Sequence, residues 1–253
     1  MHPRPLTRAV PVLLVAGASL GLLGGCGSAA PATAPTTETP TTTPTTRAPT
    51  TEAPTTTTTT GTSTSTTVGV KGVPEVDVKP LGKGANDVYV IGDSVLLGAK
   101  EEVPAELDGW DVTMDAEGSR RLTQAVGDIE ANGADARVVV INLGNNYIPG
   151  EESPGGATTF AGQIDEVMEL LSDVDRVVWV TVAEVSDSRR EINEAIRAVE
   201  DDHDNAVVLD WAAVVEANPG NDEIAGDALH LGAAGQQAIA ELIAAGVGPA
   251  PAG

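Results

Sequence analysis

The chain has 253 residues, and its 37 Asp and Glu residues outnumber its 14 Lys and Arg residues, which gives a formal net charge of −23. This charge repels phosphates, so the composition argues against nucleic-acid binding and against electrostatic attachment to anionic lipid headgroups. The single cysteine excludes a disulfide within the chain, so the fold must depend on its apolar core.

The first 25 residues have the pattern of an export signal, with Arg4 and Arg8 before a short apolar stretch that glycine and proline interrupt. The segment that ends at Cys26, Leu-Gly-Gly-Cys, resembles the bacterial lipobox, in which the cysteine is lipidated. We therefore expect a lipoprotein signal peptide over 1–25. Cys26 would anchor the exported protein to the outer face of the bacterial cytoplasmic membrane. An ordinary secretory signal with an incidental cysteine is the alternative.

Threonine, proline, alanine and serine make up almost all of residues 27–68. Such a segment buries too little apolar surface to offset the entropy cost of ordering it. We predict a disordered linker over 26–85, and a short disordered tail over 249–253. At about 3.1 Å per residue, some 40 residues of extended linker would reach roughly 130 Å into the cell wall. A passive spacer of no particular length is the simpler interpretation.

Apolar, β-rich runs alternate with helical patterns over residues 86–248. The runs 138–141 and 177–180 are continuously apolar, as expected of parallel strands that are covered on both faces. We predict one α/β domain, a three-layer α/β/α sandwich with a central, mostly parallel five-stranded sheet. The predicted strands are Asp87–Ile91, Trp110–Met114, Arg137–Leu143, Arg176–Val182 and Ala206–Leu209.

Ser94 directly follows the first predicted strand and begins the next helix. Its side chain would project from the carboxyl edge of the sheet, where functional groups gather in α/β folds. The free backbone N–H groups at a helix start also stabilise negative charge. A serine that only caps the helix is the alternative.

Gly144, Asn145 and Asn146 follow the third predicted strand, at the same edge of the sheet. An asparagine amide donates a hydrogen bond without carrying charge, which suits an oxyanion hole. A polar turn is the alternative for these residues.

Asp227 and His230 stand just before the last predicted helix. A carboxylate so placed can reach the histidine Nδ1, fix its tautomer and leave Nε2 facing a serine. His2 lies in the predicted signal and His203 in an acidic run, so His230 is nearly the only base available. A histidine of the core is the alternative.

Together these segments resemble the four sequence blocks of the SGNH/GDSL hydrolase family, which has a flavodoxin-like fold. The blocks are Gly-Asp-Ser at 92–94, a glycine-containing segment at 115–120, Gly-Asn-Asn-Tyr at 144–147 and Asp-Ala-Leu-His at 227–230. Tyr147 stands where the family usually has aspartate. The first two blocks also resemble the extracellular SGNH domains of peptidoglycan O-acetyltransferases.

The resemblance implies a catalytic triad of Ser94, Asp227 and His230. It also implies an oxyanion hole whose donors are the backbone N–H of Ser94, the backbone N–H of Gly118 or Ser119, and the side-chain amide of Asn146. No cofactor and no metal is expected.

We therefore expect a monomeric serine esterase or acyl-transfer enzyme of the cell envelope. It would act on small O-acyl esters of carbohydrate, with acetyl as the expected acyl group. The first alternative is a non-catalytic envelope-binding protein on a degenerate SGNH fold. The second is a metal-dependent hydrolase built on His203 and its acidic neighbours. Arg120, Arg189 and Arg190 are candidates for substrate contact, although surface arginines near loops more often face solvent.

Overall fold

The computed structural model describes residues 70–251. The predicted signal peptide, Cys26 and residues 26–69 of the predicted linker lie outside the described residues, as do the last two residues of the predicted tail. Among residues 70–251, no helix has the length and apolarity that crossing a membrane requires.

A five-stranded sheet with strand order β2-β1-β3-β4-β5 forms the centre of the domain, and every strand pairing is parallel. Strand β1, which lies between β2 and β3, pairs Val88 with Val112 of β2 on one side and with Val138 of β3 on the other. The predicted parallel sheet is therefore confirmed. The strands are β1 (Asp87–Gly92), β2 (Asp111–Ala116), β3 (Val138–Asn142), β4 (Arg176–Val180) and β5 (Ala206–Leu209).

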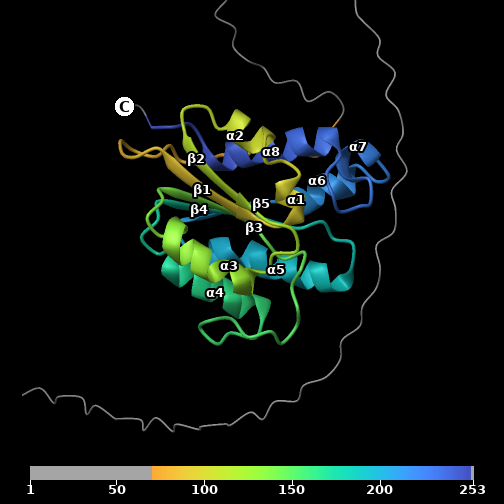
Figure 1. Cartoon of the computed structure of the whole chain (residues 1–253). Helices are drawn as coiled ribbons and strands as arrows, with labels where there is room; N and C mark the ends of the chain where they lie inside the picture. Colours follow the sequence, from red (N-terminus) through yellow and green to blue (C-terminus); the bar gives the residue numbers. More distant parts are fainter. Residues whose placement is uncertain (1–69, 252–253) are drawn as a thin grey trace, which may run out of the picture. The chain divides into compact units, whose positions relative to one another are not determined.

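Helices cover both faces of the sheet, as the predicted three-layer sandwich requires (Figure 1). One face is covered by α3 (Leu122–Asp128), the π-helical turn η1 (Ile129–Gly133), α4 (Phe160–Leu170) and α5 (Asp187–Asp202). The other face is covered by α1 (Ser94–Leu97), α2 (Glu102–Glu106), α6 (Trp211–Ala217), α7 (Asp222–Ala225) and α8 (Ala233–Val247).

Two apolar cores, one on each face of the sheet, explain why the central strands are continuously apolar. Val88 and Val90 of β1 pack into the core beneath α8, whereas Tyr89 and Ile91 pack into the core beneath α3 and α4. Successive side chains of a strand point to opposite faces, so a strand between two helical layers needs apolar residues at every position.

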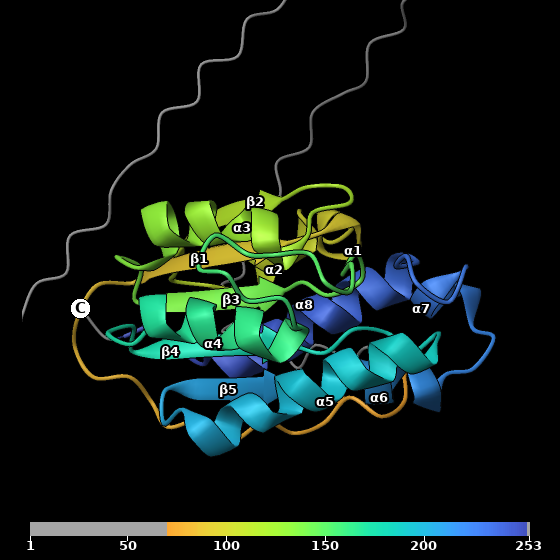
Figure 2. The same cartoon turned by 90° about the horizontal axis from the view of Figure 1, so that it is seen from below.

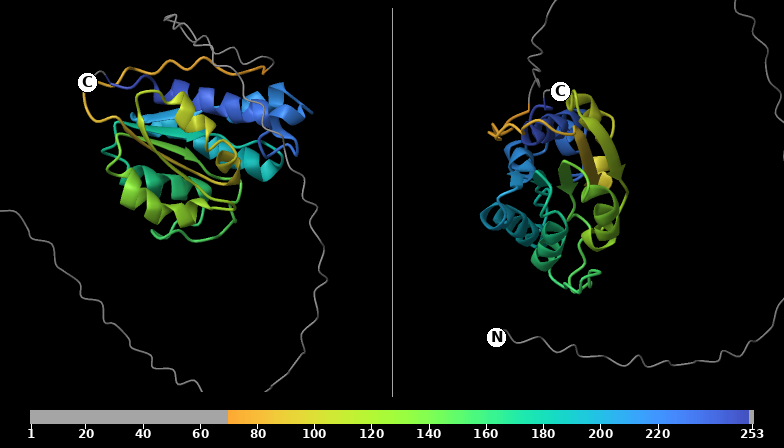
Figure 3. Two further views of the ribbon diagram at one scale, coloured as in Figure 1. Left: turned by 45° about the horizontal axis from the view of Figure 1, so that its top comes forward. Right: turned by 90° about the vertical axis from the view of Figure 1, so that its left-hand side faces the viewer.

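Residues 70–85, which we assigned to the linker, lie against the domain and have no helix or strand. We call this segment the strap. Buried Arg176 donates a hydrogen bond to the Lys79 carbonyl, and Asn218 exchanges hydrogen bonds with the Lys71 backbone. The strap runs past β5 and α6 (Figures 2 and 3). Its composition changes from threonine and proline to spaced apolar residues, of which four pack against the α8 core: Val70, Val73, Val76 and Leu81.

A cavity of about 760 Å³ lies between the strap and β5. None of the predicted site residues lines it. At the C-terminal end of the described chain, Ala250 of the predicted tail is partly buried against the α8 core, and Trp110 donates a hydrogen bond from its indole to the Gly248 carbonyl at 2.9 Å. The domain therefore includes residues on both sides of the predicted boundaries.

Candidate active site

Ser94 is the first residue of α1, immediately after β1. Asp93, and not Ser94, caps this helix, because its carboxylate accepts a hydrogen bond from the Val95 backbone N–H at 3.0 Å. The interpretation of Ser94 as a simple helix cap is therefore wrong. Its hydroxyl is left available for another partner.

Asp93 is completely buried and connects the ends of β1 and β3. Its Oδ2 accepts hydrogen bonds from the side-chain amides of Asn145 at 2.9 Å and Asn146 at 3.4 Å. Burial raises the pKa of the Asp93 carboxyl, although hydrogen bonds from Val95 and Asn145 and the charge of Arg189 act in the opposite direction. Sequence reasoning gave Asp93 no role. Its position just before a helix was the signal for a cap.

His230 lies next to Ser94, although 136 residues separate them in the chain. The distance from Ser94 Oγ to His230 Nε2 is 3.1 Å, and the distance from His230 Nδ1 to Asp227 Oδ2 is 2.7 Å. The three side chains thus form a continuous line of hydrogen-bonding groups. Half of the His230 side chain is exposed, so the line is open to solvent.

Asp227 also fixes the backbone of its own loop. Its Oδ1 accepts hydrogen bonds from the backbone N–H groups of Leu229 at 3.0 Å and His230 at 2.6 Å. The side-chain hydrogen bond from His230 and these two backbone bonds hold the pKa of Asp227 well below its ordinary value. Asp227 therefore stays ionised and can hold the Nδ1 proton of a neutral imidazole.

Close packing of α7 on α8 positions the loop that carries His230. A Cβ atom at Gly235 would lie 2.0 Å from the Ile224 carbonyl oxygen, so only glycine permits this approach. The Gly232 backbone N–H donates to the same carbonyl at 3.1 Å. Ala225 and Leu231 form an isolated antiparallel bridge that closes the loop.

Gly118 and Ser119 lie in the loop between β2 and α3, and neither forms a hydrogen bond with Ser94 or His230 among residues 70–251. Their backbone N–H groups make no hydrogen bond to another described residue. The choice between them as oxyanion donor therefore stays a prediction. Neighbouring Arg120 is buried and ion-paired, with Nη2 2.8 Å from Asp115 Oδ1, so a carboxylate of the chain neutralises it and it anchors this loop.

Asn146 connects the second and third sequence blocks. Its Nδ2 donates to the Arg120 carbonyl at 3.3 Å as well as to Asp93 at 3.4 Å. Both distances are at the long end of the hydrogen-bond range, so a stronger acceptor would compete for this amide. Next to it, the Tyr147 ring packs edge-on against Phe160, with ring centroids 5.3 Å apart.

Backbone strain is confined to two of these loops. Ser119 and Ala228, both with a φ of 62°, are the only residues other than glycine with positive φ in the described part of the chain. Such conformations cost free energy and persist where the surrounding structure imposes them, often at functional sites. One lies in the second sequence block and the other between Asp227 and His230.

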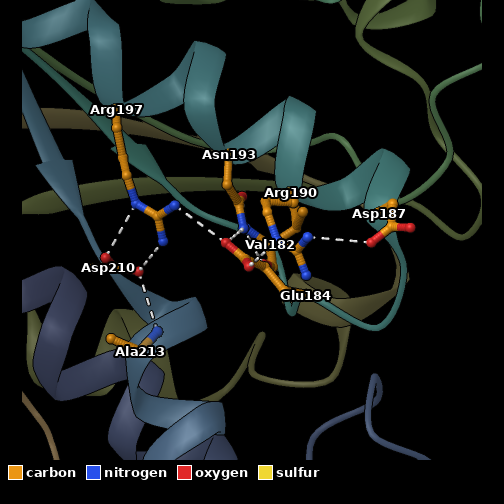
Figure 4. Close-up of polar contacts among 8 residues, drawn as sticks. All are labelled: Val182, Glu184, Asp187, Arg190, Asn193, Arg197, Asp210 and Ala213. Atoms are coloured by element: carbon orange, nitrogen blue, oxygen red, sulfur yellow. Dashed lines mark hydrogen bonds and ion pairs between the residues drawn. The ribbon is translucent and has the colours of Figure 1, made fainter.

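A charged groove of about 660 Å³ borders the His230 loop at Ala228. Arg197 bridges Glu184 and Asp210 here, with nitrogen–oxygen distances of 3.1 and 3.0 Å (Figure 4). Burial opposes ionisation of Glu184, but hydrogen bonds from Asn193 and Arg197 outweigh it and lower its pKa. Burial also opposes ionisation of Asp210, and the hydrogen bond from Arg197 does most to lower its pKa. Both carboxylates thus stay ionised and neutralise Arg197.

His203, the centre of the alternative metal site, lies at the carboxyl end of α5, where its backbone N–H donates to Val199. Within residues 70–251, no group of three or more His, Cys, Asp and Glu side chains is arranged to hold a metal ion.

Comparison with models of protein families found no match, and comparison with curated proteins found none. Among solved structures, the chain is similar to the C-terminal catalytic domain of Streptococcus pneumoniae peptidoglycan O-acetyltransferase A, with a TM-score of 0.53 and 23% identity over 64% of this chain and 93% of that one.

Two further solved structures have a similar fold. One is a member of the lipolytic protein G-D-S-L family from Veillonella parvula, with a TM-score of 0.51 and 19% identity over 62% of this chain and 94% of that one. The other is LAE5, an alpha/beta hydrolase enzyme from the metagenome of Lake Arreo, with a TM-score of 0.51 and 14% identity over 66% of this chain and 96% of that one. The described part of the chain thus has the fold of the SGNH/GDSL hydrolase family.

Proposed function

We propose that this protein is a serine esterase or acyltransferase of the SGNH type that uses Ser94, His230 and Asp227 on small O-acyl esters, above all acetyl esters, of cell-envelope carbohydrate. The observation that carries the proposal is the line of hydrogen-bonding groups from Ser94 Oγ through the imidazole to the Asp227 carboxylate. Each group stands at the distance that proton transfer from the serine requires.

In the first half of the reaction, His230 Nε2 takes the proton of the Ser94 hydroxyl as Oγ attacks the carbonyl carbon of the ester. Negative charge develops on the carbonyl oxygen, where the backbone N–H of Ser94, the backbone N–H of Gly118 or Ser119, and the Asn146 amide would stabilise it. The carbon–oxygen bond to the alcohol then breaks. The alcohol leaves with the proton from the imidazolium, and the acyl group stays on Ser94.

In the second half, His230 removes a proton from an incoming hydroxyl, which attacks the acyl carbon. The bond from that carbon to Ser94 Oγ then breaks, and the imidazolium returns the proton to Oγ. Water as acceptor gives a carboxylic acid, and a sugar hydroxyl gives a new ester. Asp227 remains ionised throughout, holds the Nδ1 proton and stabilises the imidazolium that forms. The two outcomes need the same residues, so the acceptor decides between esterase and transferase.

The site of action is proposed from the N-terminal sequence. The lipobox-like segment at Cys26 and the threonine-rich linker would hold the domain outside the cytoplasmic membrane and let it reach the cell wall. The similarity in fold to a peptidoglycan O-acetyltransferase domain supports a carbohydrate ester of the envelope as substrate.

The test is hydrolysis of p-nitrophenyl acetate by the domain with its strap, residues 70–251, comparing wild type with Ser94→Ala. We expect the variant to lose turnover and a chelator to have no effect. Ser172→Ala is the matched control, because Ser172 is exposed and follows α4, and it should keep full activity. Equal turnover by wild type and Ser94→Ala would refute the serine mechanism, whereas no turnover by the wild type would favour an envelope-binding protein on the same fold.

A further inference from the structure

A cavity of about 240 Å³ lies at the carboxyl edge of the sheet, between the loop after β3 and the start of α5. We call it the Arg189 pocket. It is much smaller than the groove at Ala228, and its volume suits one small polar group. The residues that line it include Gly144, Asn145, Tyr147, Ser186, Ser188 and Arg189.

The guanidinium of Arg189 is incompletely paired in this pocket. Its Nη2 donates to the Asn145 carbonyl at 3.3 Å, which is a long hydrogen bond. Its Nη1 is buried and has no hydrogen-bond partner among residues 70–251. No carboxylate of the described chain forms an ion pair with Arg189. A buried cationic donor without a partner is unfavourable, so this group has the capacity to bind a further acceptor.

The two other arginines of α5 differ from Arg189 in this respect. Arg190 Nη1 lies 3.2 Å from Asp187 Oδ1, and Arg197 binds both Glu184 and Asp210 (Figure 4). Carboxylates of the chain therefore neutralise these two cations. Of these three arginines, only Arg189 has no ion-pair partner among residues 70–251, although its charge acts on buried Asp93.

The Arg189 pocket adjoins the proposed reaction centre through Asn145. The Asn145 backbone carbonyl accepts from Arg189, and its side-chain amide donates to Asp93, the residue before Ser94. The next residue, Asn146, is the proposed oxyanion donor. An anion bound by Arg189 would thus belong to the molecule whose ester lies at Ser94.

We propose that Arg189 is a specificity-determining residue that binds a carboxylate or phosphate group on the alcohol side of the ester. This inference rests on the proposed function, in which the acyl group has only a few atoms and the anion must belong to the carbohydrate. A chain with a net charge of −23 repels anions, so an anionic substrate needs a dedicated cation. The planar guanidinium fits carboxylate and phosphate oxygens with paired hydrogen bonds.

The experiment compares acetyl esters of phenols that differ only in the para group. They are the anionic p-acetoxybenzoate, its neutral counterpart p-acetoxybenzamide, and p-acetoxyphenyl phosphate, which has a larger anionic group. For each protein the readout is the ratio of kcat/KM for a charged ester to kcat/KM for the neutral one. Arg189→Gln should lower this ratio by about tenfold, mainly by raising KM for the charged ester, because a hydrogen-bonded charge pair is lost. The carboxylate and phosphate arms identify which anion the pocket prefers.

Arg190→Gln is the control, because Arg190 is the next residue, has the same charge and has an exposed side chain. It should leave the ratio within twofold of wild type, whereas Arg189→Lys should restore part of the loss. Equal ratios in Arg189→Gln and wild type, or equal losses in Arg189→Gln and Arg190→Gln, would overturn the inference.

Binding separates this inference from the proposed function. Saturation-transfer NMR should show that p-hydroxybenzoate binds to the Ser94→Ala variant. The double variant that has both Ser94→Ala and Arg189→Gln should not bind it. If p-acetoxybenzamide is turned over only when Ser94 is present but the charge ratio is independent of Arg189, the proposed function stands and this inference fails. If no ester is turned over, loss of p-hydroxybenzoate binding in the double variant still supports the pocket, and unchanged binding refutes it.

Discussion

The corner around Asp93 and the loop from Asp227 to His230 meet at the Ser94 hydroxyl, but different forces hold them in place. The Asp93 corner is buried, and side-chain hydrogen bonds join the ends of β1 and β3. The His230 loop is exposed, and backbone packing of α7 on α8 positions it. The proposed nucleophile therefore depends on buried polar groups, whereas the proposed base depends on two glycines, Gly232 and Gly235, and one carboxylate.

Asp227→Asn removes the carboxylate that holds His230, and it is expected to have the largest effect on activity. The amide cannot hold the Nδ1 proton as a carboxylate does, so kcat for p-nitrophenyl acetate should fall by about 10³- to 10⁴-fold. The exposed Asp222→Asn, on α7, is the matched control and should retain activity. A loss below tenfold would mean that Asp227 has no part in catalysis.

The two asparagines that donate hydrogen bonds to Asp93 are expected to differ, because Asn146 is proposed to act in catalysis and Asn145 to stabilise the fold. Asn146→Ala should reduce kcat by about 10²- to 10³-fold, because a proposed oxyanion donor is lost. Asn145→Ala should instead lower the free energy of unfolding by about 1–3 kcal/mol, because buried Asp93 loses its 2.9 Å hydrogen bond. Denaturant unfolding and steady-state kinetics on both variants check this division. The opposite pattern would assign the oxyanion role to Asn145.

Gly235→Ala tests whether packing of α7 on α8 positions the base. The added Cβ would lie 2.0 Å from the Ile224 carbonyl, so α7 and the loop must move. We expect a loss of about 1–3 kcal/mol in unfolding free energy, and an activity loss of about 100-fold from the displaced imidazole. Gly127→Ala, at an exposed position of α3 with open space around it, should leave activity unchanged and raise the unfolding free energy by about 0.5–1 kcal/mol through helix propensity. Full activity in Gly235→Ala would show that the loop tolerates this movement.

The smallest expected effect concerns the Glu184–Arg197–Asp210 bridge beside the His230 loop. Both carboxyl pKa values are lowered in the folded state, so the bridge stabilises above the ordinary carboxyl pKa and loses this effect as pH falls through the lowered values. Because the groups are partly exposed, Arg197→Gln should cost about 0.5–1 kcal/mol near neutral pH. Thermal unfolding at several pH values should show the difference from wild type closing in acid. A difference that grows in acid would contradict the assignment.

Much of the fold was predictable because the signal is local. Continuous apolar runs such as 138–141 and 177–180 specify parallel strands between two layers. The first run lies in β3 and the second in β4. Strand ends were less accurate, since the side chain of Trp110 packs near the carboxyl end of α8 and β2 begins one residue later. The strap was missed because only contacts with distant residues order it, as with Lys71 and Asn218.

The proximity of Ser94, Asp227 and His230 was predictable from residue type and position, and their catalytic role stays a proposal. The site was not predictable where two loops must meet in space. Arg120 is buried among carboxylates because β2 and α3 lie side by side. The incomplete hydrogen bonding of Arg189 depends on which groups its neighbours bind in the folded chain. Sequence spacing alone contains neither piece of information.

The most direct test of the proposed chemistry is intact-mass spectrometry of the domain after brief exposure to p-nitrophenyl acetate, with Asp227→Asn included to slow release of the acyl group. The account predicts a species heavier by one acetyl group, located on Ser94 by peptide mapping and absent from Ser94→Ala. An acetyl group on another residue, or no adduct although p-nitrophenol is released in a Ser94-independent reaction, would contradict it.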